Sequence, residues 1–424
     1  MNVGLLIILV LLVLSFLGIP IYIALGIGTL LALNIAEMPL IVLPQKLIAG
    51  MNASSLLAIP LFILAGNVMS RSITSKLIDI CNSILGHIKG SLAMVTVLAS
   101  GLFGAISGSG VATASAIGGI TIPAMKKEGY PGEFAAAVNS ISSILGPIIP
   151  PSVVLIVYSS ITNVSVAKLF LGTVLPGVVL VTALIVYTLI YGKRHNFPSH
   201  PKASGKQMVQ AFKGGVWALL MPVIILGGIF GGVFTPTEAA AVAVVYAVLV
   251  SLFIYRDLPL KEVPQVFIDA AISTSTIMVL VGLSKASSYV ITTSGLPQEL
   301  VETFTKMTSS KAVILLLINV LFLIIGMLME ANAAVVMMVP ILTPLLNAFG
   351  VDMLHFGIFM NFNLCIGLVT PPVGLCLLIS DNISGSGLSR TLKSLWPMLL
   401  IAIIVLFATT YIPALTTWLP SLMN

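Results

Sequence analysis

The stretch ILGPIIPPSV, from Ile144 to Val153, places three prolines and a glycine inside an apolar segment long enough to cross a membrane. Proline lacks the amide proton that an α-helix needs, and its ring clashes with the preceding turn. Backbone that leaves the helix at membrane depth persists only where protein, water or a ligand satisfies its polar groups. We therefore expect a discontinuous helix over about residues 134–160 that lines a binding site.

The composition of the chain indicates a membrane protein. Of its 424 residues, 58% are hydrophobic and 8% are charged, whereas soluble domains carry about 25% charged residues. Uncharged runs of the roughly 20 residues that cross a bilayer as a helix recur along the chain. We therefore predict an all-α polytopic membrane protein with about ten to twelve membrane-embedded elements.

The charged residues indicate how the chain lies in the membrane. Residues 193–214 contain five lysines and arginines and no acidic residue, so the positive-inside rule places this loop in the cytoplasm. Loops of this kind also explain the net charge of +6 without nucleic-acid binding. The first uncharged run is too long for a signal peptide, so we predict a retained first span and a mature chain that begins at Met1.

A second proline pair reveals an internal repeat. The stretch CIGLVTPPVG, from Cys365 to Gly374, repeats the pattern Gly-x-x-x-Pro-Pro, and the numbering offset between the two copies is 367 − 146 = 221. Paired, Gly/Pro-interrupted apolar segments are typical of transporter binding sites. We expect a second discontinuous helix over about residues 356–381. The same offset superposes five Gly and Pro pairs: Gly129 and Gly350, Pro123 and Pro344, Gly146 and Gly367, Pro150 and Pro371, and Pro151 and Pro372.

A second irregular element lies upstream of each proline pair. Residues 104–125 are rich in Gly, Ser and Ala, which predicts a re-entrant hairpin with its tip near Ser107 to Gly110. Residues 326–346 are the counterpart, with a polar tip at Glu330 to Asn332. Small residues also line ordinary interfaces between membrane helices, so close helix packing is the alternative interpretation.

Such breaks free carbonyl and hydroxyl oxygens, which are the ligands of small hard cations, while helix N-termini attract anions. We predict one cation site in each repeat and a carboxylate-binding site between the hairpin tips. The cation-site candidates are Ser107, Ser109, Gly146, Ile149 and Pro150 in the first repeat and Gly326, Glu330, Gly367 and Thr370 in the second. The substrate-site candidates are Ser109, Gly110, Ser143, Asn332 and Ala333.

Few ionisable residues interrupt the apolar segments. Glu238 follows Thr235 and Pro236 and is expected to cap a helix, while Asp269, Lys285 and His355 are expected at helix ends near the interface. Glu330 is the exception, so sodium coupling is favoured over proton coupling. The chain has four histidines and three isolated cysteines and lacks a catalytic constellation, which argues against an enzyme. A channel is disfavoured because no filter motif stands out.

These features predict the organisation of the chain. Residues 1–78 would form an N-terminal scaffold with a first span, an interfacial helix near Pro39 to Ser55 with Lys46 at the headgroups, and a second span. The first transport repeat would follow at 79–192, then the basic loop at 193–214 and scaffold spans with a linker at 215–264. The second repeat would occupy 265–393, and a C-terminal span 394–424.

Four stretches resemble a known family over nearly the whole chain. They are SSLLAIPLFILAGNVM (Ser54 to Met69), SGSGVATASAIGGITIPAM, GPIIPPSV and LVTPPVG. Together they resemble the large, DctM-like membrane subunit of tripartite ATP-independent periplasmic (TRAP) transporters. The resemblance implies an inverted-repeat elevator-type fold and sodium-driven import of an organic acid across the bacterial inner membrane. It also implies at least two sodium sites, at the residues named above.

The resemblance also implies partners. These are a small four-helix membrane subunit, a soluble periplasmic substrate-binding protein, and the surrounding lipid. No additional four-span region precedes the first span, so we expect the small subunit to be a separate polypeptide. The overall character also resembles the sialic-acid branch of the family. No single residue decides between a sialic acid and a C4-dicarboxylate, so the substrate class stays open. A self-sufficient ion-coupled carrier of organic anions, which needs no binding protein, is the alternative.

Overall fold

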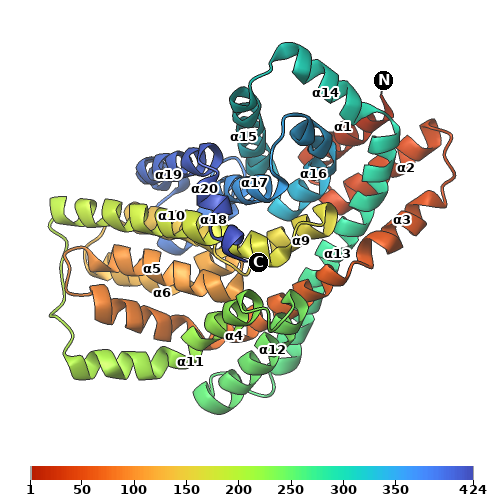
Figure 1. The fold of residues 1–424 in the computed structure, drawn as a ribbon. Coiled ribbons are helices and arrows are strands. Elements are labelled where there is room, and N and C mark those ends of the chain that lie inside the picture. The colour runs from red at the N-terminus through yellow and green to blue at the C-terminus, as the bar shows by residue number, and fades with distance from the viewer. Residues whose placement is uncertain (1, 424) are drawn as a thin grey trace.

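The structure is a computed structural model that describes residues 2–423, and it contains helices and no strands in that range (Figure 1). The helices of the N-terminal part are α1 (Val3–Phe16), α2 (Ile21–Ile35), α3 (Val42–Met51), η1 (Ser54–Leu57) and α4 (Ala58–Leu85). Those of the first repeat are α5 (Ser91–Ser107), α6 (Gly110–Lys127), α7 (Gly132–Ser143), α8 (Leu145–Ile148), α9 (Val153–Thr162) and α10 (Val166–Arg194). The connecting helices are α11 (Gly205–Phe230), α12 (Pro236–Leu249) and the π-helical turn η2 (Val250–Tyr255). The remaining helices are α13 (Val263–Thr293), α14 (Leu296–Met307), α15 (Lys311–Leu328), α16 (Ala331–Ala348), α17 (Met353–Gly367), α18 (Leu375–Ser384), α19 (Leu388–Tyr411), α20 (Ala414–Thr417) and η3 (Pro420–Leu422).

The first uncharged run forms two helices where the sequence suggested a single span. The chain turns between α1 and α2, where Gly18 adopts a φ of +81° and Pro20 precedes the first residue of α2. Glycine tolerates this left-handed conformation, and proline prevents α1 from continuing. The two helices pack closely, because a Cβ on Gly28 would lie 3.3 Å from the carbonyl oxygen of Ile7.

The basic segment is also more ordered than the predicted loop at 193–214. Helix α11 already begins at Gly205, where the hydroxyl of Ser204 accepts a hydrogen bond from the amide of Gln207. The Gln207 side chain in turn accepts from the amide of Ser204, which completes a capping box. Nearly half of the predicted loop, residues 205–214, therefore forms the first turns of a long apolar helix.

The two discontinuous helices and the two hairpins are confirmed. Hairpin 1 consists of α5 and α6, hairpin 2 consists of α15 and α16, and the bounds of α6 and α16 are related by the same numbering offset as the proline pairs. Both hairpins are longer than the predicted 104–125 and 326–346, since each includes a complete preceding helix. Helix α7 is separated from α9, and α17 from α18, by segments with the cis bonds Pro150–Pro151 and Pro371–Pro372.

The repeats have opposite directions. The hydroxyl of Tyr158, near the end of α9, donates to the carbonyl of Met353 at the base of hairpin 2, at 2.6 Å. The amine of Lys126, at the base of hairpin 1, donates to the carbonyl of Ser384 at the end of α18, at 2.7 Å. Helix α10 begins beside the end of α9 and finishes at the base of hairpin 1, where Gly192 packs on Gly90. The two hairpin bases therefore lie at opposite ends of α10.

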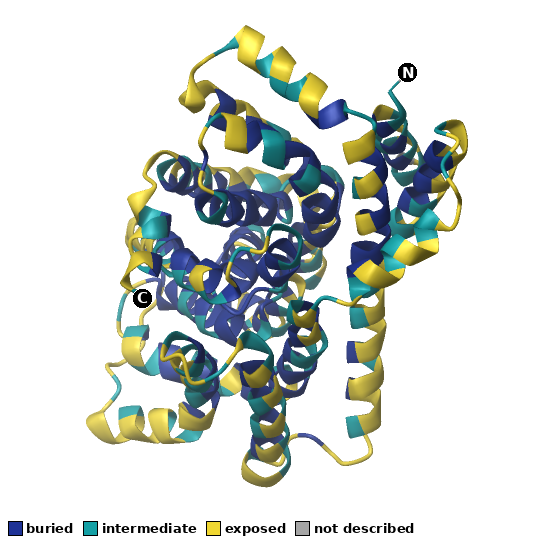
Figure 2. Cartoon of the chain, turned by 45° about the vertical axis from the view of Figure 1, so that its right-hand side comes forward, coloured by how far each residue is buried: buried dark blue, intermediate teal, exposed yellow. Residues whose placement is uncertain are grey.

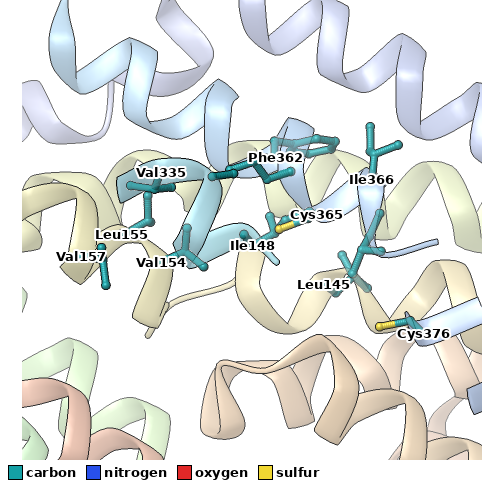
Figure 3. Packing of buried hydrophobic residues seen from close by; sticks show 14 of the residues in the cluster. Leu145, Ile148, Val154, Leu155, Val157, Val335, Phe362, Cys365, Ile366 and Cys376 are labelled. Atoms are coloured by element: carbon teal, nitrogen blue, oxygen red, sulfur yellow. The ribbon is translucent and has the colours of Figure 1, made fainter. Parts of the chain in front are cut away.

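The broken helices form the centre of the molecule. Among the described residues, nine helical segments are long and apolar enough to cross a membrane. In the segment Gly132–Thr162, 89% of the most apolar window is buried, against 28% for α11 (Figure 2). Figure 3 shows how Leu145, Ile148 and Leu155 of the first repeat pack near Phe362 and Cys365 of the second. The outer helices, among them α1, α2 and α11, expose apolar side chains of the kind that face lipid.

Candidate functional site

A cavity of about 260 Å³ lies where the two hairpin tips meet the two broken helices. Each repeat contributes its hairpin turn and part of its broken helix, and α4 and α13 close the remaining side. The cavity thus combines elements that lie far apart in the sequence. Its polar lining residues are Asn67, Ser107, Ser109, Ser273, Glu330 and Asn332, and its apolar and glycine lining includes Ile63, Gly66, Gly108, Gly110, Val111, Pro147, Val153, Ile277, Leu368 and Leu375.

Oxygen atoms gather at the tip of hairpin 1. The hydroxyl of Thr113 donates to the carbonyl of Ser109 at 2.7 Å and lies 3.4 Å from the hydroxyl of Ser107. Gly146 packs directly against this group, since a Cβ there would lie 2.6 Å from the Ser109 carbonyl oxygen and 2.9 Å from the Thr113 hydroxyl. Two hydroxyls and a carbonyl therefore converge where only a glycine fits.

The tip of hairpin 2 has a carboxylate at the equivalent position. Glu330 corresponds to Ser109 in the repeat, and each is the N-cap of the second hairpin helix. One carboxylate oxygen of Glu330 accepts from the amide of Ala333 at 3.2 Å, and the other accepts from the side-chain amide of Asn332 at 2.7 Å. The N-terminal ends of α6 and α16 both reach the cavity, and each brings a partial positive charge.

A close backbone contact supports each broken helix. A Cβ on Gly367 would lie 2.3 Å from the carbonyl carbon and oxygen of Gly326, so the end of α17 touches the end of α15. Nearby, the amide of Val373 donates to the carbonyl of Met327 at 3.3 Å. The hydroxyl of Thr370 donates to the carbonyl of Ile366 at 2.7 Å. Carbonyls at the ends of α15 and α17 are therefore partly used to hold the break of the second repeat.

The predicted site residues fall into two groups. Those that line the central cavity are Ser107, Ser109, Gly110, Glu330 and Asn332. Those that lie behind it are Ser143, Gly146, Ile149, Pro150, Gly326, Ala333, Gly367 and Thr370. Ser143, predicted to face a substrate, is fully buried, and its hydroxyl donates to the carbonyl of Ser140 at 2.6 Å. Ala333 contributes its amide to the Glu330 cap.

Sequence reasoning missed Asn67, Thr113 and Ser273. Thr113 lies one helical turn after Ser109, a spacing that places both on one face of α6 and could have identified it. Asn67 and Ser273 come from α4 and α13, which the sequence indicated only as a scaffold span and the start of the second repeat. Only the packing of these helices brings their side chains to the hairpin tips.

The other ionisable residues have varied environments. Glu238 caps α12 as predicted, because its carboxylate accepts from the amide of Thr235 at 2.8 Å. His355 lies in the first turn of α17, at a helix end as predicted, and it is buried with bonds to Thr416 and Thr410. Lys285 lies two helical turns before the end of α13 and lines a second cavity of about 440 Å³.

Within residues 2–423, no group of three or more His, Cys, Asp or Glu side chains lies close enough to hold a metal ion. The oxygen cluster at hairpin 1 is of another kind, because hydroxyl and carbonyl ligands suit a hard cation. The described fold and site, with inverted repeats, paired hairpins and a central polar cavity, are those of a helical secondary transporter.

Comparisons with known proteins agree with this class. The family described as "Tripartite ATP-independent periplasmic transporter, DctM component" matches residues 8–415, so the chain belongs to that family and is a TRAP transporter large permease. It is 40% identical over 410 residues to the uncharacterized protein YgiK of Salmonella typhimurium, covering 96% of this chain and 94% of the relative. It is 41% identical over 368 residues to the C4-dicarboxylate TRAP transporter large permease protein DctM of Pseudomonas aeruginosa, covering 87% and 86%.

Two further matches are to a longer permease and to a transporter of known structure. The chain is 33% identical over 417 residues to the sialic acid TRAP transporter permease protein SiaT of Haemophilus influenzae, covering 98% of this chain and 68% of the relative. The crystal structure of the YdaH transporter of Alcanivorax borkumensis is similar with a TM-score of 0.60 and 14% identity, covering 88% of this chain and 87% of that one. The latter likeness concerns the fold alone.

Proposed function

We propose that the protein imports an organic acid across the bacterial inner membrane by sodium symport, and that it receives the acid from a periplasmic binding protein. The observation that carries this proposal is the central cavity, in which both hairpin tips and both broken helices converge. A relative that transports C4-dicarboxylates and one that transports sialic acid fit the same substrate class. Either acid would present a carboxylate to the tips.

The oxygen clusters support sodium as the coupling ion. At hairpin 1, Ser107, Ser109 and Thr113 offer two hydroxyls and a carbonyl beside Gly146. At hairpin 2, Glu330 adds a carboxyl group near the carbonyls of Gly326 and Gly367, and its ionised form would bring a full negative charge to a bound cation. A cation bound to these groups would complete ligand sets that the chain leaves incomplete, and at least two such sites are proposed.

The charge of Glu330 gives a physical reason for coupling. A substrate carboxylate that enters between the tips meets the favourable N-terminal ends of α6 and α16, and also the anionic Glu330. At about 4 Å, two like charges repel by about 1–4 kcal/mol, depending on the effective dielectric constant. Prior binding of a cation would remove this repulsion, so acid and sodium would bind together.

The arrangement of the helices supports an elevator mechanism. The hairpins pack on the broken helices at Gly146 and Gly367 and form one body with them, while α4 and α13 line one side of the cavity with Asn67 and Ser273. We propose that the hairpin body moves against these two helices and carries the site across the membrane. With residues 193–214 in the cytoplasm, hairpin 1 would open to the cytoplasm and hairpin 2 to the periplasm. The end of α1 near Asn2 would then be periplasmic, because Asn2 donates to the carbonyl of Ser294 just before α14.

The outer surface supports a small membrane partner. Helices α1, α2 and α13 expose large apolar residues such as Leu9, Leu31 and Ile272. A small helical subunit, together with lipid, would cover part of this surface and thicken the fixed part of the transporter. The alternative, a self-sufficient carrier, predicts that these faces contact lipid alone.

Uptake by purified components tests the proposal. Proteoliposomes containing this chain and its small partner receive binding protein loaded with labelled succinate or labelled N-acetylneuraminic acid, with an inward sodium gradient. We expect uptake of one acid that requires sodium, the small partner and the binding protein. Uptake driven by a pH gradient in sodium-free buffer would overturn sodium coupling, and full uptake by this chain alone would favour the self-sufficient carrier.

A further inference from the structure

The second cavity, of about 440 Å³, lies outside the central site and is larger than it. It is bounded by α3 and α13 on one side and by the end of α9 and the second half of α16 on the other. We call it the vestibule. Its polar lining residues are Ser160, Thr162, Ser284, Lys285, Ser288, Thr292, Thr343 and Asn347, and its other lining residues include Gly50, Val281, Pro340, Pro344 and Met353.

The vestibule is positively charged. Lys285 is the one ionisable side chain among its lining residues, and the lining contains no Asp or Glu. Within residues 2–423, Lys285 takes part in no ion pair and no side-chain hydrogen bond. The hydroxyls of Ser160, Thr162, Ser284 and Thr343 donate to backbone carbonyls. The hydroxyls of Ser288 and Thr292 and the side-chain amide of Asn347 are the lining groups that can donate hydrogen bonds to an anion beside Lys285. This set of groups suits a carboxylate better than a cation.

Close packing fixes the position of the Lys285 backbone. A Cβ on Gly50 of α3 would lie 2.7 Å from the Cβ of Lys285, so no larger residue fits between the two helices there. The exposed part of the lysine side chain therefore extends from a rigid helix contact.

Helix α13 joins the vestibule to the central cavity. Ser273 and Ile277 of this helix line the central cavity, while Val281, Ser284 and Ser288 line the vestibule. These positions follow one another at three- and four-residue intervals, so they form one face of the helix. Lys285 lies about 12 Å along the helix from Ile277. Between the two cavities, the hydroxyl of Ser284 donates to the carbonyl of Val336 in hairpin 2 at 2.5 Å.

The vestibule lies at the base of hairpin 2, which is the periplasmic side if residues 193–214 are cytoplasmic. We propose that the vestibule is an entry site for an organic acid, in which Lys285 binds a substrate carboxylate before the acid reaches the hairpin tips. The inference rests on the proposed function, because it assigns the acid a route into the same central cavity. Opening the Ser284–Val336 contact, when hairpin 2 moves, would connect the two cavities along α13.

Cysteine labelling tests the vestibule without transport. The native Cys81, Cys365 and Cys376 are buried, so Ser288→Cys provides an accessible thiol beside Lys285. We expect this cysteine to react faster with an anionic methanethiosulfonate than with a cationic one, and the rate ratio to fall about tenfold when Lys285→Met is added. Lys285→Arg should preserve the ratio. A ratio that does not respond to Lys285→Met would overturn the proposal.

Protection of the Ser288→Cys thiol from labelling identifies the ligand of the vestibule. Millimolar succinate or N-acetylneuraminic acid should slow labelling of Ser288→Cys, whereas succinamide, a neutral analogue of succinate, should not. The protein is labelled in neutral phosphatidylcholine vesicles and in vesicles with phosphatidylglycerol. Protection by phosphatidylglycerol but by neither acid would assign the site to lipid and overturn the proposal.

Uptake kinetics separate the proposed entry site from the proposed function. Lys285→Met should raise the KM for uptake at least about fivefold with a maximal rate within about twofold of the unmodified protein, because only the entry site is weakened. If Lys285→Met transports with a normal KM, the role of the vestibule as an entry site is overturned, while the proposed function stands. Absence of uptake by the unmodified protein with all its partners would count against the proposed function, while the labelling would still report on the vestibule.

Discussion

Hairpin 1 and hairpin 2 place an N-cap residue at the same position in the repeat, but their turns differ in backbone conformation and in chemistry. Gly108 is left-handed with a φ of +62°, whereas the equivalent Met329 is extended with a φ of −143°. Ser109 and Glu330 occupy the same position in the repeat, and each caps the helix that follows it. Around Ser109 the chain supplies the hydroxyls of Ser107 and Thr113. The residues equivalent to these two in the second repeat are Leu328 and Ala334, which have no side-chain oxygen.

Under the proposed sodium coupling, this difference would make the two tips two different kinds of ion site. The first repeat gathers neutral oxygens, and the second replaces them with one carboxylate. A carboxylate binds a cation more strongly per group than a hydroxyl, because the interaction is between full charges. The proposed site of the second repeat would therefore need fewer side-chain ligands. The following predictions test this division, beginning with the features that both repeats share.

The largest effect is expected from the glycines behind the two tips. Gly367→Ala and Gly146→Ala would place a Cβ 2.3 Å and 2.6 Å from backbone atoms of Gly326 and Ser109. Overpacking of this kind costs about 1–3 kcal/mol and shifts the backbone. We expect uptake to be lost in both variants, with expression retained, as measured by proteoliposome uptake and by size-exclusion chromatography of the purified protein.

Gly119→Ala is the matched control. It lies in hairpin 1 and a Cβ there would meet no atom within 4 Å, so normal uptake is expected. Uptake near normal in both Gly146→Ala and Gly367→Ala would mean that the close contacts serve only to bend the helices.

The next effect concerns the carboxylate that distinguishes hairpin 2. Glu330→Gln removes its charge and keeps an oxygen that can accept from the amide of Ala333. Loss of a unit charge near a bound cation should raise the sodium concentration for half-maximal uptake at least about tenfold. The equivalent change in hairpin 1, Ser109→Ala, should have a smaller effect, and a larger effect of Ser109→Ala would reverse the proposed division.

A third prediction concerns the neutral oxygens of hairpin 1. Thr113→Val removes the hydroxyl that lies between Ser107 and Ser109 and keeps the shape of the side chain. We expect the sodium concentration for half-maximal uptake to rise about threefold to tenfold, as for the loss of one hydrogen-bonding or ligand group. Thr113→Ser should restore normal sodium dependence, and an unchanged response in Thr113→Val would exclude this hydroxyl as a ligand.

The smallest effect on transport is expected from a buried set of hydrogen-bonded side chains around Asn319 in the second repeat. The side-chain amide of Asn363 donates to the side-chain oxygen of Asn319 at 2.9 Å, and Asn319 also donates to Thr410. The first repeat has Leu98 at the position equivalent to Asn319. Asn319→Leu leaves buried polar groups without partners, so we expect a loss of about 1–3 kcal/mol in stability.

Thermal unfolding in detergent measures this loss, and sodium-dependent uptake below the unfolding temperature should stay normal. The double change Asn319→Leu with Asn363→Leu should recover part of the stability, because both partners become apolar. A changed sodium dependence in Asn319→Leu would connect this group to an ion site and contradict its structural role.

The sequence by itself determined the class of the fold and the internal repeat of the protein. Uncharged runs indicated the membrane, and the constant offset that relates Gly146 to Gly367 and each proline pair to the other indicated the repeat, because glycine and proline restrict the backbone wherever they occur. Those residues act locally, so their effect can be read without knowing what packs on them. The turn at Ser107–Gly110 was predicted from its small residues and the turn at Glu330–Asn332 from its polar residues, and both turns are observed.

The tertiary structure decided which residues face the cavity and which lie behind it. Ser143 and Ser107 are both serines next to helix breaks, yet Ser143 is buried against its own helix and Ser107 opens to the central cavity. Asn67, Ser273 and Lys285 belong to helices whose sequence has no break, and only long-range packing brings them to the two cavities. The direction of a side chain depends on the rotation of its helix against distant neighbours, which no local pattern in the chain specifies.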